Sequence, residues 1–263
     1  MKINFFILFF LWTIKSIACS CGFSTMNDLF MYSDFVAKVK ITKSLKEWNF
    51  ENAFNPYSVS FTIEELYKGE NITSISLSSF SDSDCGLVIT EGSEWIIFAY
   101  KNKDNQYFTD LCSGSKQIDR VFTNPRYPNA EKNHSLRINK TLEVLRLLKK
   151  YNVEVTNKIS LSNSNDNFNE HYNKFNACDF LNQYGVYKII LNADLSIKDV
   201  VTIKGYTKKF DKGLKKIIKE KVKFIKHNQK NRNSVPQDTE WLFLTEGVKY
   251  GEQSCYFNHN IHL

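Results

Sequence analysis

The sequence has few of the residues and motifs that mark an enzyme active site. It holds only five histidines, His134, His171, His227, His259 and His262, and none of them stands in a recognised catalytic motif. It also has no Gly-rich phosphate-binding loop, no G-x-S-x-G nucleophile elbow and no HExxH zinc-protease motif. An enzyme needs a nucleophile or base with an orienting partner. Because no residue stands out for either role, we expect a protein that is not an enzyme and that uses no cofactor.

The chain also lacks an apolar run long enough to cross a membrane. The most apolar stretch, residues 3–14, spans about twelve residues, whereas a transmembrane helix needs roughly twenty. Lys2 precedes it, and the small residue Ala18 lies just before Cys19. This arrangement is typical of a cleaved secretory signal peptide. We therefore expect residues 1–18 to be removed, leaving a protein that starts at Cys19 and is secreted or lies in a bacterial cell envelope or periplasm.

The cysteines bear on an alternative form of processing. A bacterial lipoprotein signal also ends in a small residue before cysteine, but it usually has Leu where this chain has Ser16. All six cysteines follow the expected cleavage point, at Cys19, Cys21, Cys85, Cys112, Cys178 and Cys255. An even number of cysteines in an exported chain favours complete disulfide pairing. Lipidation would consume the Cys19 thiol and leave an odd number, so we favour the unlipidated form and keep a lipid anchor at Cys19 as the alternative.

The first half of the chain has the pattern of a small barrel or sandwich. In residues 57–69, Val59, Phe61 and Ile63 alternate with polar residues, which is the period of a half-buried strand. A short helix that Asn27 could cap comes before the strands. The helix is expected at 25–32, and other short strands with polar turns between them are expected at 33–44, 73–80, 95–101 and 106–112.

A second pattern follows the strands. In residues 139–151, Leu142, Leu145 and Leu148 recur at helical spacing, and we expect this helix to pack against the barrel. The Asn- and Ser-rich stretch after it has the composition of a loop or linker. We therefore expect an N-terminal β-rich domain over 19–152, a linker over 153–177 and a second domain over 178–263.

The second domain is expected to be a small α+β unit. Its elements are a hairpin, a basic helix and a last strand, at 186–191 with 200–204, from about Asp211, and at 239–247. Cys178 and Cys255 stand at the two ends of this unit, where a disulfide would close it. Cys255 could instead bind a metal with His259 and His262, but we favour the disulfide because the last residues of a chain are commonly disordered.

The cysteines of the first half stand in a distinctive local context. The predicted mature chain starts with Cys19-Ser20-Cys21, Cys85-Gly86 comes before EGSEWIIFAY, and Leu111-Cys112 ends the next strand. In order, spacing and context, these features resemble the netrin-type module of the tissue inhibitors of metalloproteinases over residues 19–115. The resemblance implies an OB-fold-like barrel and the two bridges Cys19–Cys85 and Cys21–Cys112.

The resemblance also implies a mode of action. In this family the α-amine and carbonyl of the first cysteine chelate the catalytic zinc of the target protease, at the position that a catalytic zinc keeps open. The next side chain, here Ser20, points at the specificity pocket of the protease. Cys19 and Ser20 are therefore the candidate inhibitory residues, and a zinc metalloprotease is the candidate partner. The protein itself is expected to hold no metal.

The chain departs from these inhibitors in several respects. Gly22 and Phe23 follow the second cysteine, the third bridge of the inhibitors' N-terminal domain has no counterpart, and their cysteine-rich C-terminal domain is absent. Netrin-type modules also occur in proteins that inhibit no protease. The alternative function is therefore a cell-envelope interaction or scaffold protein without inhibitory activity.

The C-terminal unit has its own resemblance and its own charge. The hairpin VYKIILNADLSIKDVVTIKG, the basic helix and the strand TEWLFL resemble the C-terminal domain of TonB-type envelope proteins, although Phe224 lacks the usual proline beside it. The resemblance implies an envelope partner, bound by strand addition.

Between Lys204 and Arg232, twelve Lys and Arg residues stand against two acids, which makes an anionic surface another candidate partner. We favour a solvated helix face as the reason for this charge, and export argues against nucleic acid. The sequence indicates no oligomeric state.

Overall fold

The structure describes most of the chain. It is a computed structural model, and the described residues are 21, 25–45, 54–80, 87–155, 161–163, 177–226, 234–250, 254–258 and 261. The signal peptide expected at 1–18, the candidate residues Cys19 and Ser20, and Cys85 lie outside these residues.

The described elements fall into a strand-rich first half and a mixed second half. The helices are α2 (Met26–Tyr32), α3 (Ala130–Lys150), α5 (Lys208–Lys221) and the 3-10 helix η1 (Ala177–Phe180). The strands of the first half are β1 (Phe35–Leu45), β2 (Phe54–Lys68), β3 (Ser74–Phe80), β4 (Glu94–Lys101), β5 (Tyr107–Thr109) and β6 (Lys116–Gln117). The strands of the second half are β7 (Leu161–Asn163), β8 (Tyr184–Leu191), β9 (Ile197–Lys204), β10 (Phe224–Lys226), β11 (Thr239–Tyr250) and β12 (Ser254–Asn258).

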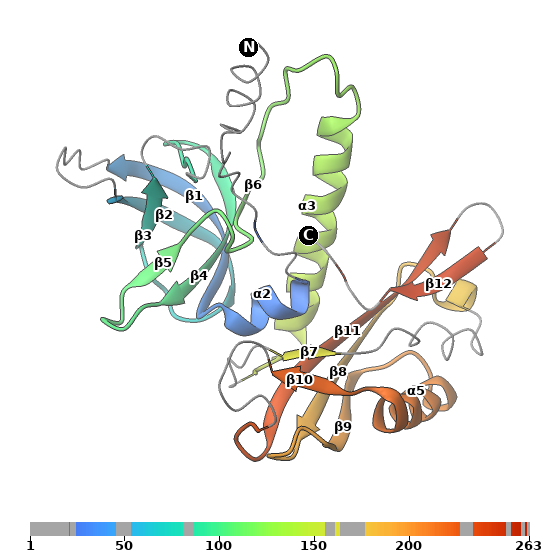
Figure 1. Ribbon diagram of the computed structural model, residues 1–263. Coiled ribbons are helices and arrows are strands. Elements are labelled where there is room, and N and C mark those ends of the chain that lie inside the picture. Colours follow the sequence, from blue (N-terminus) through green and yellow to red (C-terminus); the bar gives the residue numbers. More distant parts are fainter. Residues whose placement is uncertain are drawn as a thin grey trace, which may run out of the picture.

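The first half forms a closed barrel, which confirms the barrel expected from the strand pattern (Figure 1). Five strands follow the order β1-β2-β3-β5-β4, and the ring closes because β1 also pairs with β4. Every neighbouring pair is antiparallel except β3 and β5, which run parallel. The pairing of β1 with β2 contains three register shifts. Such bulges bend a strand, which lets β1 pair with both β2 and β4.

Side chains that alternate along the strands fill the barrel. Val59 and Phe61 of β2 and Ile75 and Leu77 of β3 are buried, as their alternation predicts, while Ile63 is only partly buried. The same core receives residues from β1 and β4: Phe35, Ala37, Val39, Ile41, Trp95, Ile97 and Ala99. Because successive side chains point to opposite faces of a strand, half of them suffice to fill a barrel of this size.

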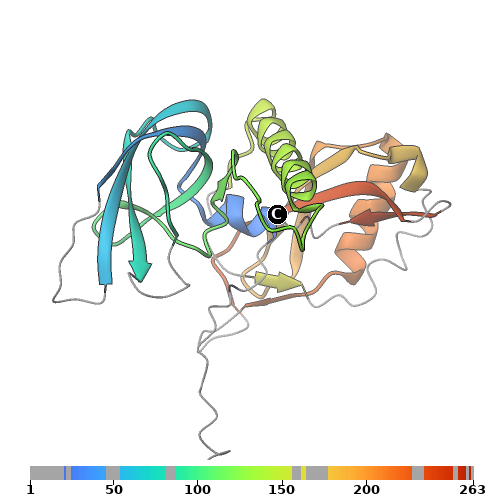
Figure 2. The ribbon, with the colours of Figure 1, turned by 90° about the horizontal axis from the view of Figure 1, so that it is seen from above.

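Strand β4 is buried on both faces, which explains its unbroken apolar run. Ile97 faces the barrel interior, whereas Ile96 and Phe98 belong to a second core outside the barrel. Helices α2 and α3 and the sheet of the second half contribute to this second core. Figures 1 and 2 both show α2 and α3 between the barrel and that sheet. One hydrophobic core therefore runs from the barrel wall through the helices to the second sheet.

The second core includes residues from both sides of the boundary expected after residue 152. Helices α2 and α3 belong to the expected first domain, but both bury their apolar faces in the core of the second sheet. In the stretch expected to be a linker, Val153, Val155 and Leu161 are buried in that core, and β7 pairs with β10. Residues 156–160 and 164–176 of this stretch lie outside the described residues. A division into separate domains at this point stays a prediction.

The second sheet has the order β12-β11-β8-β9 and is antiparallel throughout. The expected hairpin, helix and closing strand are present, and β10 and β12 are additional. Helix α5 begins after the cap Thr207 and buries Phe210, Leu214 and Ile218. Ile217 is only partly buried, and Val222, expected on the helix face, instead follows the last helical residue. Ile225, also expected on that face, lies in β10.

Two helices differ from expectation at their first residues. Thr25, not Asn27, caps α2: its hydroxyl accepts from the Asp28 backbone N–H while the Asp28 carboxylate accepts from the Thr25 backbone. Helix α3 was expected from residue 139 but begins at Ala130. Its residues before Ile138 are exposed or half-buried, so they show no apolar periodicity by which the sequence could reveal them. No helix among the described segments is both long and apolar enough to span a membrane.

Candidate functional site at the tethered N-terminus

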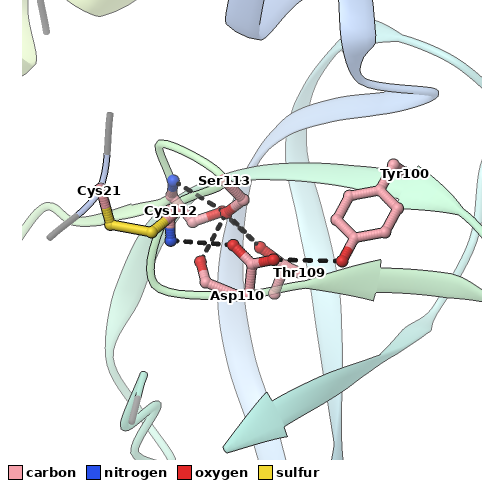
Figure 3. Close-up of a disulfide and its surroundings, with 7 residues drawn as sticks. Cys21, Tyr100, Thr109, Asp110, Cys112 and Ser113 are labelled. Carbon is pink, nitrogen blue, oxygen red and sulfur yellow. Dashed lines mark hydrogen bonds between the residues drawn. A yellow bond between two sulfur atoms is a disulfide. The ribbon is translucent and has the colours of Figure 1, made fainter. Parts of the chain in front are cut away.

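A disulfide ties the start of the described chain to the barrel. Cys21 and Cys112 form this bridge, with Cα atoms 5.2 Å apart and a sequence separation of 91 (Figure 3). The resemblance to the inhibitors implies the same pair. In the chain-entropy model, closing a loop of this length disfavours the unfolded chain by about 4–5 kcal/mol. The bridge therefore fixes the chain at a point two residues after Cys19, although Cys19 and Ser20 lie outside the described residues.

Cys112 lies on a turn that Asp110 organises. Oδ1 of Asp110 accepts a hydrogen bond from the backbone N–H of Cys112 at 2.8 Å. The Asp110 carbonyl accepts from the backbone N–H of Ser113 at 3.2 Å and from its hydroxyl at 2.8 Å. An Asp side chain that bonds the backbone two residues on forms an Asx turn. This turn ends β5 at Thr109, so the strand expected to reach Cys112 stops short.

Hydroxyl side chains complete the hydrogen bonding of β4 where its neighbours leave a gap. Phe98 lies between the part of β4 that pairs with β5 and the part that pairs with β6. Its carbonyl accepts from Thr109 Oγ1 at 2.9 Å and from Ser115 Oγ at 3.2 Å, and its N–H donates to Ser115 Oγ at 2.9 Å. Buried backbone groups need such partners. The turn that carries Cys112 is thereby fastened to the barrel wall on both sides.

Tyr100 holds the same turn from outside. Its hydroxyl donates to Oδ2 of Asp110 at 3.1 Å (Figure 3). Burial raises the pKa of Tyr100, and the charge of Asp110 raises it further. Tyr100 therefore remains a protonated donor at physiological pH. Asp110 binds Tyr100 with one carboxylate oxygen and the turn backbone with the other. We call the turn at 109–115, which carries Cys112, the N-terminal platform, and Asp110 lies at its centre.

The turn around Cys112 offers rigidity, and its described residues include no cluster of metal ligands. In the described part of the chain, no group of three or more His, Cys, Asp or Glu residues could hold a metal ion. Of the five histidines, His134 alone lies within that part, and its Nε2–H donates to the carbonyl of Gln117 at 2.8 Å. His171, His227, His259 and His262 lie outside it.

A second disulfide closes the C-terminal unit. Cys178 of η1 and Cys255 of β12 form it, with Cα atoms 5.2 Å apart. Phe180, also in η1, packs its ring on those of Phe210 and Phe257, with centroids 5.2 and 6.0 Å away. The bridge therefore joins the start of the unit to its edge strand, and the aromatic rings beside it pack the same two elements together. Two disulfides in one chain are typical of proteins that leave the reducing cytosol.

The predicted basic segment lies mostly on α5, and most of the lysines on this helix are exposed. Lys219 pairs with Asp199 at 2.9 Å, and Lys216 with Glu220 at 3.8 Å. Lys208, Lys209 and Lys212 are exposed, and no carboxylate of the described chain forms an ion pair with them. The structure thus places a cationic face on this helix, which belongs to the second half of the fold.

Sequence reasoning missed the residues that support the tether. Thr109, Asp110, Ser113 and Ser115 lie in the stretch TDLCSGS around Cys112. A signal was present, because Asp two residues before the cysteine and Gly114 two residues after it favour a turn. The hydroxyl contacts to β4 could not be read in the same way, since they join residues 11 and 17 positions apart.

The chain matches no protein-family model, and no curated protein has significant sequence similarity to it.

Proposed function

We propose that this protein is an exported, disulfide-bonded binding protein of the netrin type that inhibits a zinc metalloprotease through its N-terminal cysteine. The observation that carries the proposal is the Cys21–Cys112 bridge, which anchors the chain two residues after Cys19 to a turn fastened to the barrel. The strand order β1-β2-β3-β5-β4 with a closing β1–β4 pair supports an OB-fold assignment, because OB-folds are five-stranded Greek-key barrels.

The chemistry of inhibition would come from the backbone of Cys19. After removal of residues 1–18, its α-amine has a reference pKa of about 8, so an appreciable fraction is neutral and free to bind metal at physiological pH. The amine and the Cys19 carbonyl together would occupy the open position on the zinc of the protease. A rigid support lowers the entropy that the chelate loses on binding. Ser20 would then enter the pocket next to the zinc.

The test compares two forms of the secreted protein that differ by one residue. The first starts at Cys19, and the second carries one alanine before Cys19, which moves the α-amine away from the zinc. We expect the first form to inhibit at least one member of a panel of zinc endopeptidases and the second to inhibit at least 100-fold more weakly. A form with one alanine added after Leu263 is the matched control. Equal inhibition by the first two forms would refute chelation.

The mass of the native N-terminal peptide tests the starting point of the proposal. A free amine on Cys19 in a disulfide-bonded peptide is required. A diacylglyceryl thioether on Cys19 would eliminate both its bridge and the chelate, and would favour the alternative described next.

The second candidate function is a cell-envelope interaction, and the cationic face of α5 favours it. Lys208, Lys209 and Lys212 would bind an anionic surface, while β9, an edge strand of the second sheet, would accept a strand of a partner. Replacing the three lysines by Glu should abolish co-sedimentation with vesicles that contain anionic lipid. The same charge change on α3, at Lys132, Lys149 and Lys150, is the control. Unchanged binding by the α5 variant would exclude this face.

A further inference from the structure

A groove lies beside the turn that carries the Cys21–Cys112 bridge. It has a volume of about 670 Å³ and lies between β4, β6, the segment after β6 and the first turns of α3. Leu111 and Ser115, which flank Cys112, line one end of it. Pockets of this volume bury ligands of a few hundred daltons. The groove is thus large enough for a small organic molecule and touches the platform that holds the N-terminus.

The groove wall is apolar and aromatic on one side and cationic on the other. Leu111 and Phe122 provide apolar and aromatic surface, while Lys116, Arg120 and Arg137 provide positive charge. No Asp or Glu is among the described residues that line it. The groove therefore combines a surface that favours an apolar group with one that favours an anion.

The cations of the groove lack acidic partners in the described part of the chain. None of the ion pairs found there includes Lys116, Arg120 or Arg137. Burial lowers the pKa of Lys116, and the positive charge of Arg137 lowers it further. Removing a cation from water and placing it beside another cation is unfavourable unless an anion compensates. A bound anion would provide that compensation.

Two contacts hold the groove in shape without a ligand. His134 of α3 donates from Nε2 to the Gln117 carbonyl of β6 at 2.8 Å, which fastens the exposed first turns of the helix to the barrel. The ring of Phe122 packs on His134 with centroids 5.2 Å apart, and Arg120 lies 5.1 Å from the centre of the Phe122 ring. A site that is formed before binding costs little to order.

We propose that this groove binds an amphipathic organic anion, with its acidic group beside Lys116 and Arg137 and its apolar part against Leu111 and Phe122. The ligand class is a carboxylate, sulfate or phosphate attached to an aromatic or aliphatic body. The site is separate from the N-terminal chelate and does not depend on protease inhibition. Because its lining includes neighbours of Cys112, a bound ligand lies against the N-terminal platform.

The test uses 1-anilinonaphthalene-8-sulfonate and its uncharged analogue N-phenyl-1-naphthylamine as probes of the purified protein. We expect the sulfonate to bind at one site per chain and at least tenfold more tightly than the neutral analogue. Lys116→Met and Arg137→Met should each weaken sulfonate binding at least fivefold, and Arg137→Lys should retain most of it. Lys132→Met, an exposed lysine of α3 outside the groove lining, is the control and should bind as the parent does.

Competition then identifies the acidic group. Displacement of the probe by 2-naphthoate, 2-naphthyl sulfate or 2-naphthyl phosphate supports the proposal and names the preferred anion, whereas displacement by none of them overturns it. Equal binding of the charged and neutral probes, or unchanged binding by the Lys116 and Arg137 variants, also overturns it. Arg137 is exposed, so Arg137→Met keeps the test valid even if a change at half-buried Lys116 disturbs folding.

Discussion

The side chain of Leu29 in α2 lies directly against Gly114 in the turn that carries Cys112. A β-carbon at position 114 would lie only 2.5 Å from Leu29 Cδ1, and the backbone of Gly114 has a φ of +87°. Position 114 therefore requires glycine for two independent reasons, space and backbone conformation. The contact also links the tether of the N-terminus to the helix that joins the barrel to the second core.

Gly114→Ala should destabilise the protein more than a change at a comparable glycine. Gly92 has a φ of +81° but nothing within 4 Å of its β-carbon position. Gly92→Ala should therefore cost about 1 kcal/mol from backbone strain alone, and Gly114→Ala about 2–4 kcal/mol in chemical denaturation. Leu29→Ala removes core packing of its own, so the steric part is read from a double-mutant cycle: Gly114→Ala should cost less in the Leu29→Ala background than in the parent. Equal losses at positions 92 and 114 would contradict the contact.

The ion pair between Lys140 of α3 and Glu246 of β11 should contribute strongly to joining the helix to the second sheet. The Glu246 side chain is only 6% exposed, so Lys140→Met would leave a buried carboxylate without its cation. We expect a loss of about 2–4 kcal/mol in the free energy of unfolding. Glu246→Gln in the same background should restore part of it, because the buried charge is removed.

A matched control for this pair is Lys198→Met. Lys198 pairs with Asp238 at 2.6 Å, but both side chains are about half exposed, at 51% and 54%. Its loss should cost at most about 0.5 kcal/mol. If Lys140→Met costs no more than Lys198→Met, burial of Glu246 does not strengthen its pair.

The bidentate pair between Arg146 of α3 and Glu65 of β2 should make stability depend on acidic pH. Arg146 Nε donates to Glu65 at 2.9 Å, and the hydrogen bonds from Arg146 are the main cause that lowers the pKa of Glu65 below its usual 4.5. A lowered carboxylate pKa stabilises the folded state above the unfolded pKa, and that stability is lost as the pH falls through the folded pKa. Arg146→Met should therefore cost roughly 0.5–1 kcal/mol at neutral pH, because both side chains are partly exposed.

The pH profile of this variant is the decisive measurement. The difference in unfolding free energy between the parent and Arg146→Met should stay constant from about pH 8 to pH 5 and shrink below about pH 4.5. Arg126→Met, at an exposed arginine in the loop before α3, should show no difference at any pH. A difference for Arg146→Met that grows on acidification would contradict the assigned pair.

Removal of the Cys178–Cys255 bridge should loosen the C-terminal unit locally. The double change to alanine opens a loop with a sequence separation of 77 and should cost about 2–5 kcal/mol. Hydrogen exchange should rise in η1 and β12, the two elements that the bridge joins. Replacing Cys21 and Cys112 by alanine is the comparison, and there exchange should rise in the turn at 110–115 instead. The same exchange pattern in both variants would show that neither bridge acts locally.

The barrel could be predicted because its signal is local. Val59, Phe61, Ile75 and Leu77 alternate with polar neighbours, so the sequence of each strand indicates which of its faces is buried. Strand β5 was expected, but as a longer strand over 106–112, and the two-residue β6 was not expected because a strand of that length contains no full period. The end of β5 depends on the turn that Asp110 forms, and the gap between β5 and β6 is filled by hydroxyls that bond Phe98. These hydroxyls lie far from Phe98 in the sequence.

The sequence by itself determined the barrel strands, the main elements of the C-terminal unit and the even set of cysteines, because these follow from periodicity, turn residues and counting. Only the tertiary structure decided that β4 faces two cores, that α3 starts at Ala130, and that Lys116 and Arg137 meet Leu111 and Phe122 in one groove. A strand that is buried on both faces and helical turns that are mostly exposed show no periodic pattern of apolar residues. Contacts between distant segments likewise produce no pattern within one segment. The groove in particular exists only where separate parts of the chain come together, so no single segment could predict it.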